Sequence, residues 1–461
     1  MPIQPPVNKG QLANDKYPQL KPLWIAVFMD VLGFSLLVPI LPYLMISFNV
    51  DPFTIGLLLS VNAIASFISG PLWGGLSDKI GRKPVLLITQ SGTLAGFLLL
   101  AFSFQGQVWM VFLSRAIDGM FGGILTVSRA IIADVVSPQN RGRQMTNIGI
   151  VFTLSNIVGP LVGSLLIGVT VTGFPVIGPG LLASACCIGM ILLTIAYVRE
   201  SAPAKVNPTG LASRSGESVP TSKGEGQKST SWGSTARFLL VQWALVSFAF
   251  IVYITSISLF AYERLQLSAQ ELGLFLSVTG MAQIILRFAA FEPMLKKLGE
   301  HKTAAIGLLA FTVSYLLMGF VPDGIPGVVG LFCVLLGVTF GSVCTRGILT
   351  GYLSRAVPPA DQGKAMGFSA AIDSLSQVFG PLVGTSIITA LPLFVFGLVP
   401  SLLTAVAFAM AFKPLVFVQA VPVGAKHAPP QETRIEHVHA RVSVMKDACV
   451  EHAEYAKACE E

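Results

Sequence analysis

A short polar stretch near residue 80 separates two long apolar runs. It reads Gly74-Gly75-Leu76-Ser77-Asp78-Lys79-Ile80-Gly81-Arg82-Lys83-Pro84. One apolar run ends near Leu72 and the next begins at Val85. The glycines permit a tight turn with close backbone contact, whereas an acid and three cations cannot lie unpaired in hydrocarbon. The stretch therefore predicts a polar turn at a membrane surface, between two transmembrane helices.

The composition of the whole chain agrees with a membrane protein of many spans. Of its 461 residues, 53% are hydrophobic and only 11% are charged, whereas soluble proteins carry roughly 25% charged residues. Because about 20 apolar residues cross a bilayer, this length allows about ten to fourteen spans. The net charge of +7 indicates basic cytoplasmic loops rather than a nucleic-acid partner.

Apolar runs predict twelve transmembrane helices in two groups of six. The first group is 22–44, 53–76, 85–104, 108–131, 144–169 and 179–198, and the second is 237–260, 271–290, 304–321, 326–352, 365–389 and 391–412. Residues 199–236 are rich in Ser, Gly, Thr, Lys and Pro, which is typical of a disordered linker. We expect an all-α protein with a tail (1–21), a six-helix bundle (22–198), the linker (199–236), a second bundle (237–412) and a second tail (413–461).

Positive charges predict the orientation. With a cytoplasmic N-terminus, the outer loops carry Arg264 as their one cation. The short inner loops then carry Lys79, Arg82, Lys83, Arg141, Arg143, Lys296, Lys297, Lys302, Arg355 and Lys364. This bias places both termini in the cytoplasm. We expect the plasma membrane as the location, with the vacuole or another organelle as the alternative.

The two halves share a repeated segment. Gly159-Pro160-Leu161-Val162-Gly163 recurs as Gly380-Pro381-Leu382-Val383-Gly384. Glycines four residues apart allow close helix contact, and the proline bends the helix. A duplicated six-span unit is the expected build of a transporter that binds its substrate between the halves. We predict a hinge at Gly159, Pro160 and Gly163.

Charged residues inside the apolar runs are the candidate site residues, because each is costly in hydrocarbon. They are Asp30, Arg115, Asp118, Arg287, Arg346 and Asp373. Asp30 precedes two prolines, Pro39 and Pro42, which free backbone carbonyls and bend the first span. Asp30 either lines a cavity and binds a proton or substrate, or it is an inert paired charge.

The fourth span carries a polar stripe. Its members, spaced three or four residues apart on one helical face, are Arg115, Asp118, Gly122, Thr126 and Arg129. Arg115 and Asp118 can pair within the helix. Either the pair is structural, or Arg115 faces the cavity and tunes a nearby acid. Arg129 and Asp134 lie near the cytoplasmic end, where a snorkelling or a loop-clamping role is expected.

These segments resemble the major facilitator superfamily, and within it the twelve-span drug:proton antiporters of the tetracycline-exporter type. The matching segments are Asp30 with Gly33, Pro39 and Pro42; Leu76 to Leu86; Ser114 to Asp134; and Gly159-Pro160 with Gly163. The resemblance implies proton-coupled export by alternating access of two six-helix bundles. It also implies a cavity position for Asp30 and a coupling role for Arg115. Gly74, Asp78, Gly81, Arg82 and Lys83 would form a gating loop.

The chain also departs from that pattern. Ser164 replaces the usual last glycine of the span 5 signature, and residues 92–96, Gly-Thr-Leu-Ala-Gly, carry no acid where tetracycline exporters have one. The resemblance therefore implies small amphipathic organic compounds as a class, not tetracycline itself. Two other functions stay open. One is a carrier of organic anions such as carboxylates, held by Arg115, Arg287 or Arg346. The other is a transport-dead scaffold or receptor.

Nothing in the sequence predicts an enzyme. There is no Walker loop, so ATP does not drive the protein directly. The tail contains His437, His439, Cys449, His452 and Cys459, but their spacing matches no zinc module. We expect no catalytic residues, cofactor, metal or nucleic-acid partner. The expected partners are a small-molecule substrate, protons and the bilayer, and we expect a monomer.

Overall fold

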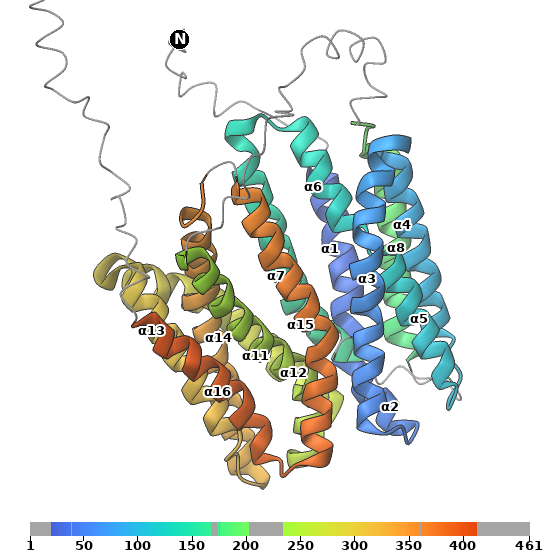
Figure 1. Cartoon of the computed structure of the whole chain (residues 1–461). Coiled ribbons are helices and arrows are strands. Elements are labelled where there is room, and N and C mark those ends of the chain that lie inside the picture. The colour runs from blue at the N-terminus through green and yellow to red at the C-terminus, as the bar shows by residue number, and fades with distance from the viewer. Residues whose placement is uncertain are drawn as a thin grey trace, which may run out of the picture. The chain divides into compact units, whose positions relative to one another are not determined.

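A computed structural model describes residues 20–37, 39–166, 174, 176–201, 234–358 and 361–412. The expected tails and nearly all of the expected linker lie outside the described residues. Every element in these ranges is a helix, as the composition predicts (Figure 1). The all-α fold predicted for the two groups of spans is confirmed.

The described part of the first half contains eight helices. They are α1 (Leu20–Leu37), α2 (Ile40–Ser47), α3 (Pro52–Ile80), α4 (Arg82–Ala101), α5 (Val108–Phe121), α6 (Ile124–Val135), α7 (Pro138–Leu166) and α8 (Ile177–Tyr197). The first predicted span is interrupted at Pro39, between α1 and α2, because proline cannot continue the hydrogen-bond ladder. The fourth span is interrupted at Gly122 and Gly123, so its polar stripe is divided between α5 and α6.

The second half contains α11 (Ser234–Leu265), α12 (Ala269–Leu286), the π-helical turn η1 (Arg287–Phe291), α13 (Glu292–Met318), α14 (Gly324–Arg355), α15 (Gln362–Ala390) and α16 (Phe394–Ala411). Within the described ranges, eleven helical runs are long and apolar enough to cross a membrane. One of them, Ala269–Met318, has 50 residues and comprises the predicted spans 271–290 and 304–321.

That long run cannot be a single span. At about 1.5 Å per residue it would exceed about 70 Å, more than twice the thickness of a bilayer core. Gly299 interrupts it with φ 78° and ψ 169°, outside the helical region, and glycine tolerates this positive φ without strain. A division at Gly299 agrees with two spans, and the full count of twelve remains a prediction.

The two halves repeat one packing plan. In the first half α1 packs on α7 and α8, and α4 packs on α5 and α8; in the second, α11 packs on α15 and α16, and α13 packs on α14 and α16. Each half has its own hydrophobic core. The repeated Gly-Pro segment makes close contacts in both halves. A Cβ at Gly163 would overlap the carbonyl oxygen of Leu36 on α1, and a Cβ at Gly384 would overlap the hydroxyl of Ser256 on α11.

The halves meet where α3 lies along α15 and α7 lies along α12 (Figure 1). A Cβ at Gly56 would lie 2.9 Å from the carbonyl oxygen of Pro381, and one at Gly273 would lie 2.8 Å from that of Pro160. Ser60 Oγ donates a hydrogen bond to the Val378 carbonyl at 2.6 Å. Each Gly-Pro segment is therefore held between the first helix of its own half and a glycine of the other half.

The two helices that bring these glycines to the interface begin alike. Asp51 caps α3 by accepting hydrogen bonds from Thr54, which hold the pKa of Asp51 below its usual value. Ser268 and Glu271 form a capping box at the start of α12, so both helix starts are fixed by side-chain hydrogen bonds. The segments that follow, Ile55-Gly56-Leu57-Leu58-Leu59-Ser60 and Leu272-Gly273-Leu274-Phe275-Leu276-Ser277, are a second internal repeat.

Candidate functional site

The first half encloses a buried ion pair. Arg115 Nη1 lies 3.2 Å from Asp118 Oδ2, and the two side chains are 2% and 9% exposed. Asn62 on α3 donates to the same Asp118 oxygen at 2.9 Å. Arg115 also lies 5.4 Å from the centroid of the Phe97 ring, a cation–π distance. Both charges are therefore held by neighbours on α3, α4 and α5.

Asp30 lies on α1, the helix whose Gly33 packs against the same Phe97 ring. A Cβ at Gly33 would lie 3.0 Å from the Phe97 ring, so one aromatic ring touches both the Asp30 helix and Arg115. Asp30 is partly buried, and no described residue forms a hydrogen bond or ion pair with its carboxylate. Of the acids in this half, Asp118 is committed to partners, whereas Asp30 has none within the described part of the chain.

The second half contains a looser pair. Arg346 Nη2 on α14 lies 3.8 Å from Asp373 Oδ2 on α15, and each side chain is 29% exposed. Ser247 on α11 donates a short hydrogen bond to the other Asp373 oxygen. The Arg346 guanidinium lies 5.3 Å from the ring centroid of Trp243 and 5.0 Å from that of Phe250. Three helices thus contribute to this cluster.

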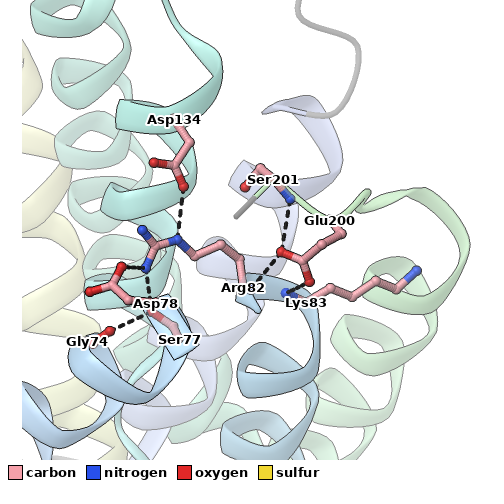
Figure 2. A network of polar contacts seen from close by, with 8 residues as sticks. All are labelled: Gly74, Ser77, Asp78, Arg82, Lys83, Asp134, Glu200 and Ser201. Carbon is pink, nitrogen blue, oxygen red and sulfur yellow. Dashed lines mark hydrogen bonds and ion pairs between the residues drawn. The ribbon is translucent and has the colours of Figure 1, made fainter. Parts of the chain in front are cut away.

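The polar turn between α3 and α4 forms a third cluster, which Figure 2 shows. Arg82 is buried at its centre. Its Nη1 lies 2.6 Å from Asp78 Oδ1 and donates to Ser77 Oγ, and its Nε donates to Asp134 Oδ2 at 2.9 Å. Arg82 therefore joins the α3–α4 turn to the end of α6. The hydrogen bond between Arg82 and Asp134 supports the loop-clamping role expected for Asp134.

Glu200, which follows α8, holds the start of α4. Its carboxylate accepts hydrogen bonds from the backbone N–H groups of Arg82 at 2.8 Å and Lys83 at 3.3 Å. These N–H groups would otherwise lack partners at the helix N-terminus, where the dipole also favours an anion. Gly81 has φ 109°, and a Cβ there would overlap the Glu200 carboxylate. The backbone angle therefore favours glycine, and a side chain at this position would displace the Glu200 carboxylate from the cap.

The structure thus brings the predicted residues together in separate groups. Arg115 pairs with Asp118 beside Phe97, Asp30 lies on the helix that packs against that ring, and Arg346 pairs with Asp373. Arg287 lies apart, exposed in the π-helical turn η1 and without a partner among the described residues. Within the described ranges no group of three His, Cys, Asp or Glu side chains is placed to hold a metal.

Several partners in these clusters were missed by sequence reasoning. They are Asn62, Phe97, Glu200, Trp243, Ser247 and Phe250. The sequence contained a pattern that could have indicated only the three partners on α11. Trp243, Ser247 and Phe250 are spaced four and three residues apart and therefore share one face of α11.

Comparison with known proteins agrees with this architecture. The model of the Major Facilitator Superfamily matches residues 23–350 and 243–446. The tetracycline resistance protein, class H, of Pasteurella multocida is 27% identical over 358 residues, which cover 77% of this chain and 85% of that protein. The multi-drug resistance efflux pump PmrA homolog of Lactococcus lactis is 27% identical over 381 residues, with coverage of 79% and 86%.

Solved structures show the same fold. The human organic anion transporter MFSD10 (TETRAN) superposes with a TM-score of 0.62 at 23% identity, over 86% of this chain and all of that one. The nucleoside transporter NupG (D323A mutant) gives 0.65 at 16% identity, also over 86% of this chain. From its helices, its internal repeats and these matches, the chain belongs to the Major Facilitator Superfamily.

Proposed function

We propose that this protein exports small amphipathic organic compounds in exchange for protons, by alternating access of its two halves. Family membership and relatives named for tetracycline resistance and multidrug efflux support this proposal. The protein would act as a monomer in the plasma membrane, with both termini in the cytoplasm. Non-enzymatic transport is the function that the family suggests.

One observation carries the proposal: Asp30 lies within a span without a bonding partner among the described residues, on a helix that packs against the Phe97 ring beside the buried Arg115–Asp118 pair. The proton affinity of a carboxylate depends on its hydration and on its distance from a cation. Both change if α1 moves relative to α4 and α5. Asp30 would bind the proton, and Arg115, Asp118 and Asn62 would supply fixed charges and dipoles.

The contacts between the halves indicate on which side of the membrane the transporter is closed in this structure. In the proposed orientation, the contacts at Gly56 and Gly273 lie on the outer side, and the cluster around Arg82 lies on the inner side. The ring pair Tyr43–Tyr262, with centroids 5.9 Å apart, joins α2 to α11 at the same outer ends. This arrangement corresponds to a transporter closed toward the outside.

Gating would use the cluster around Arg82. Asp78 pairs with Arg82, yet its side chain is 65% exposed. No described residue of α15 contacts the Asp78 carboxylate in this conformation. We propose that this contact forms in the opposite conformation, where the start of α15 would offer unpaired N–H groups and a favourable dipole.

Two alternatives remain, and one has support of its own. The partly exposed Arg346 favours an organic-anion carrier built on the same fold. A transport-dead scaffold or receptor has no such observation in its favour, because such a protein does not need charges within its spans.

Transport by the purified protein in proteoliposomes separates these functions. An imposed pH gradient should drive a cationic amphipathic dye against its concentration gradient, in the direction opposite to proton flow. Competition by excess dye or by excess carboxylate identifies the preferred substrate. Dye movement that does not respond to the pH gradient would contradict proton coupling. If neither the dye nor the carboxylate is transported, the transport-dead scaffold or receptor is favoured instead.

A further inference from the structure

The cluster around Arg346 has more donor capacity than its neighbours use. A guanidinium carries five N–H donors, but the Asp373 oxygen lies 3.8 Å away, beyond hydrogen-bond distance. No described residue accepts a hydrogen bond from the Arg346 side chain. By contrast, Arg82 donates to Ser77 and Asp134. Arg346 is therefore an intramembrane cation whose donors remain available.

The surroundings of Arg346 limit what can use those donors. Trp243 and Phe250 lie two turns apart on one face of α11, with their ring centroids 5.3 and 5.0 Å from the guanidinium carbon. Ser247 lies between them on the same face and binds Asp373. The cluster thus places two aromatic rings, that of the buried Trp243 and that of the partly buried Phe250, beside a planar, bidentate donor. The indole Nε1 of Trp243 is buried without a hydrogen-bond partner, which adds a further unused donor.

We propose that Arg346, Trp243 and Phe250 form a binding subsite for an organic anion that carries a carboxylate on a planar aromatic ring. The carboxylate would bind the guanidinium through two parallel hydrogen bonds, and the aromatic ring would stack beside Trp243 and Phe250. This inference rests on the proposed transport function and names a substrate class for it. Aromatic carboxylates are small and amphipathic, so they fall within the proposed range.

Asp373 would compete with such a ligand. Its carboxylate is the acidic partner of Arg346, and its charge would repel an incoming carboxylate. The hydrogen bond from Ser247 to Asp373 does not depend on Arg346. It can therefore persist when a ligand replaces Asp373 beside the guanidinium. Removal of the Asp373 charge should therefore strengthen anion binding. Asp118 in the other half would show no such effect, because Arg115 is 1% exposed.

The test is calorimetric titration of the purified full-length protein with 2-naphthoate, its neutral methyl ester and 2-naphthylmethylammonium. The wild type should bind 2-naphthoate in preference to the other two. Arg346→Gln should raise the Kd for 2-naphthoate at least tenfold, as expected for a charge-assisted bidentate contact. Asp373→Asn should lower the Kd severalfold.

Controls separate the subsite from general effects. Arg355→Gln removes a cation from the same helix, where Arg355 pairs with Glu300 over the Tyr352 ring, and should leave binding unchanged. Trp243→Leu should weaken binding of 2-naphthoate more than that of cyclohexanecarboxylate, since only the first can stack. A melting temperature measured for each variant identifies any loss of folded protein.

The subsite and the proposed function can fail independently. Equal affinity for 2-naphthoate in wild type and Arg346→Gln, or preference for the ammonium compound, would overturn the subsite, even if pH-driven dye transport persists. Binding that depends on Arg346 without any pH-driven transport would instead overturn the proposed function and leave the subsite.

Discussion

The two Arg–Asp pairs inside the spans differ in how they are built. Arg115 and Asp118 are three residues apart on α5, and their side chains are 2% and 9% exposed. Arg346 and Asp373 lie on α14 and α15, and each is 29% exposed. A pair within one helix keeps its distance when helices move, whereas a pair between two helices does not. The halves therefore share a packing plan but differ in their charges. The Arg115–Asp118 pair of the first half is buried and fixed, whereas Arg346 of the second half is partly exposed and available to a ligand.

The largest expected effect comes from removal of the acid in each pair. Asp118→Ala leaves Arg115 buried without its counter-ion, which should cost about 3–5 kcal/mol of unfolding free energy. Asp373→Ala removes a partly exposed pair and should cost about 1 kcal/mol or less. Chemical unfolding of the purified variants in detergent measures both. Equal losses would show that the two pairs are buried alike and would remove the contrast between the halves.

Substitution of a glycine in the repeated segment should lower the stability of the protein in either half. Gly163→Ala and Gly384→Ala each place a methyl group against a first-helix neighbour, Leu36 or Ser256, and should cost about 1–3 kcal/mol through overpacking. Gly163 should be the more sensitive, because its neighbour is a backbone oxygen that cannot rotate away. Gly149→Ala, with no atom within 4 Å of its Cβ, is the matched control on α7. Loss of stability in that control alone would contradict the packing argument.

The polar turn gives the smallest expected effects on stability. Glu200→Gln weakens the cap of α4 and should cost about 1 kcal/mol, with faster hydrogen exchange at the Arg82 and Lys83 amides. Asp78→Asn removes a largely exposed pair and should cost about 0.5 kcal/mol or less, but it should slow exchange transport. If Asp78→Asn abolished substrate binding and left exchange rates normal, its gating role would be wrong.

Much of the fold could be predicted from the sequence. Apolar runs of about 20 residues have few alternatives to a transmembrane helix, and Pro39 marked the interruption between α1 and α2. The break at Gly122 and Gly123 was not predicted, because two glycines in an apolar run are also compatible with a continuous helix. The break at Gly299, by contrast, falls in the loop predicted between the spans 271–290 and 304–321.

The sites were less predictable for a physical reason. Intramembrane charges stand out because they are rare, so Arg115, Asp118, Arg346 and Asp373 could be selected from the sequence. Their neutral partners stand out less: Phe97 lies in an apolar run where an aromatic residue is ordinary, and only the helical spacing of Trp243, Ser247 and Phe250 could have indicated the second set. Glu200 fell within the segment predicted to be disordered, and its cap depends on a contact across more than 100 residues. The second repeat, around Gly56 and Gly273, was visible in the sequence and was missed.

Proton coupling at Asp30 is the central claim, and transport by the Asp30→Asn variant tests it most directly. Asparagine fixes a neutral side chain at a position that has no described bonding partner, so folding should be little affected. In proteoliposomes we expect substrate accumulation driven by a pH gradient to be lost, while exchange of labelled for unlabelled substrate without a gradient stays measurable. A full response of Asp30→Asn to the pH gradient would contradict the account and move the proton site to Asp118 or Asp373.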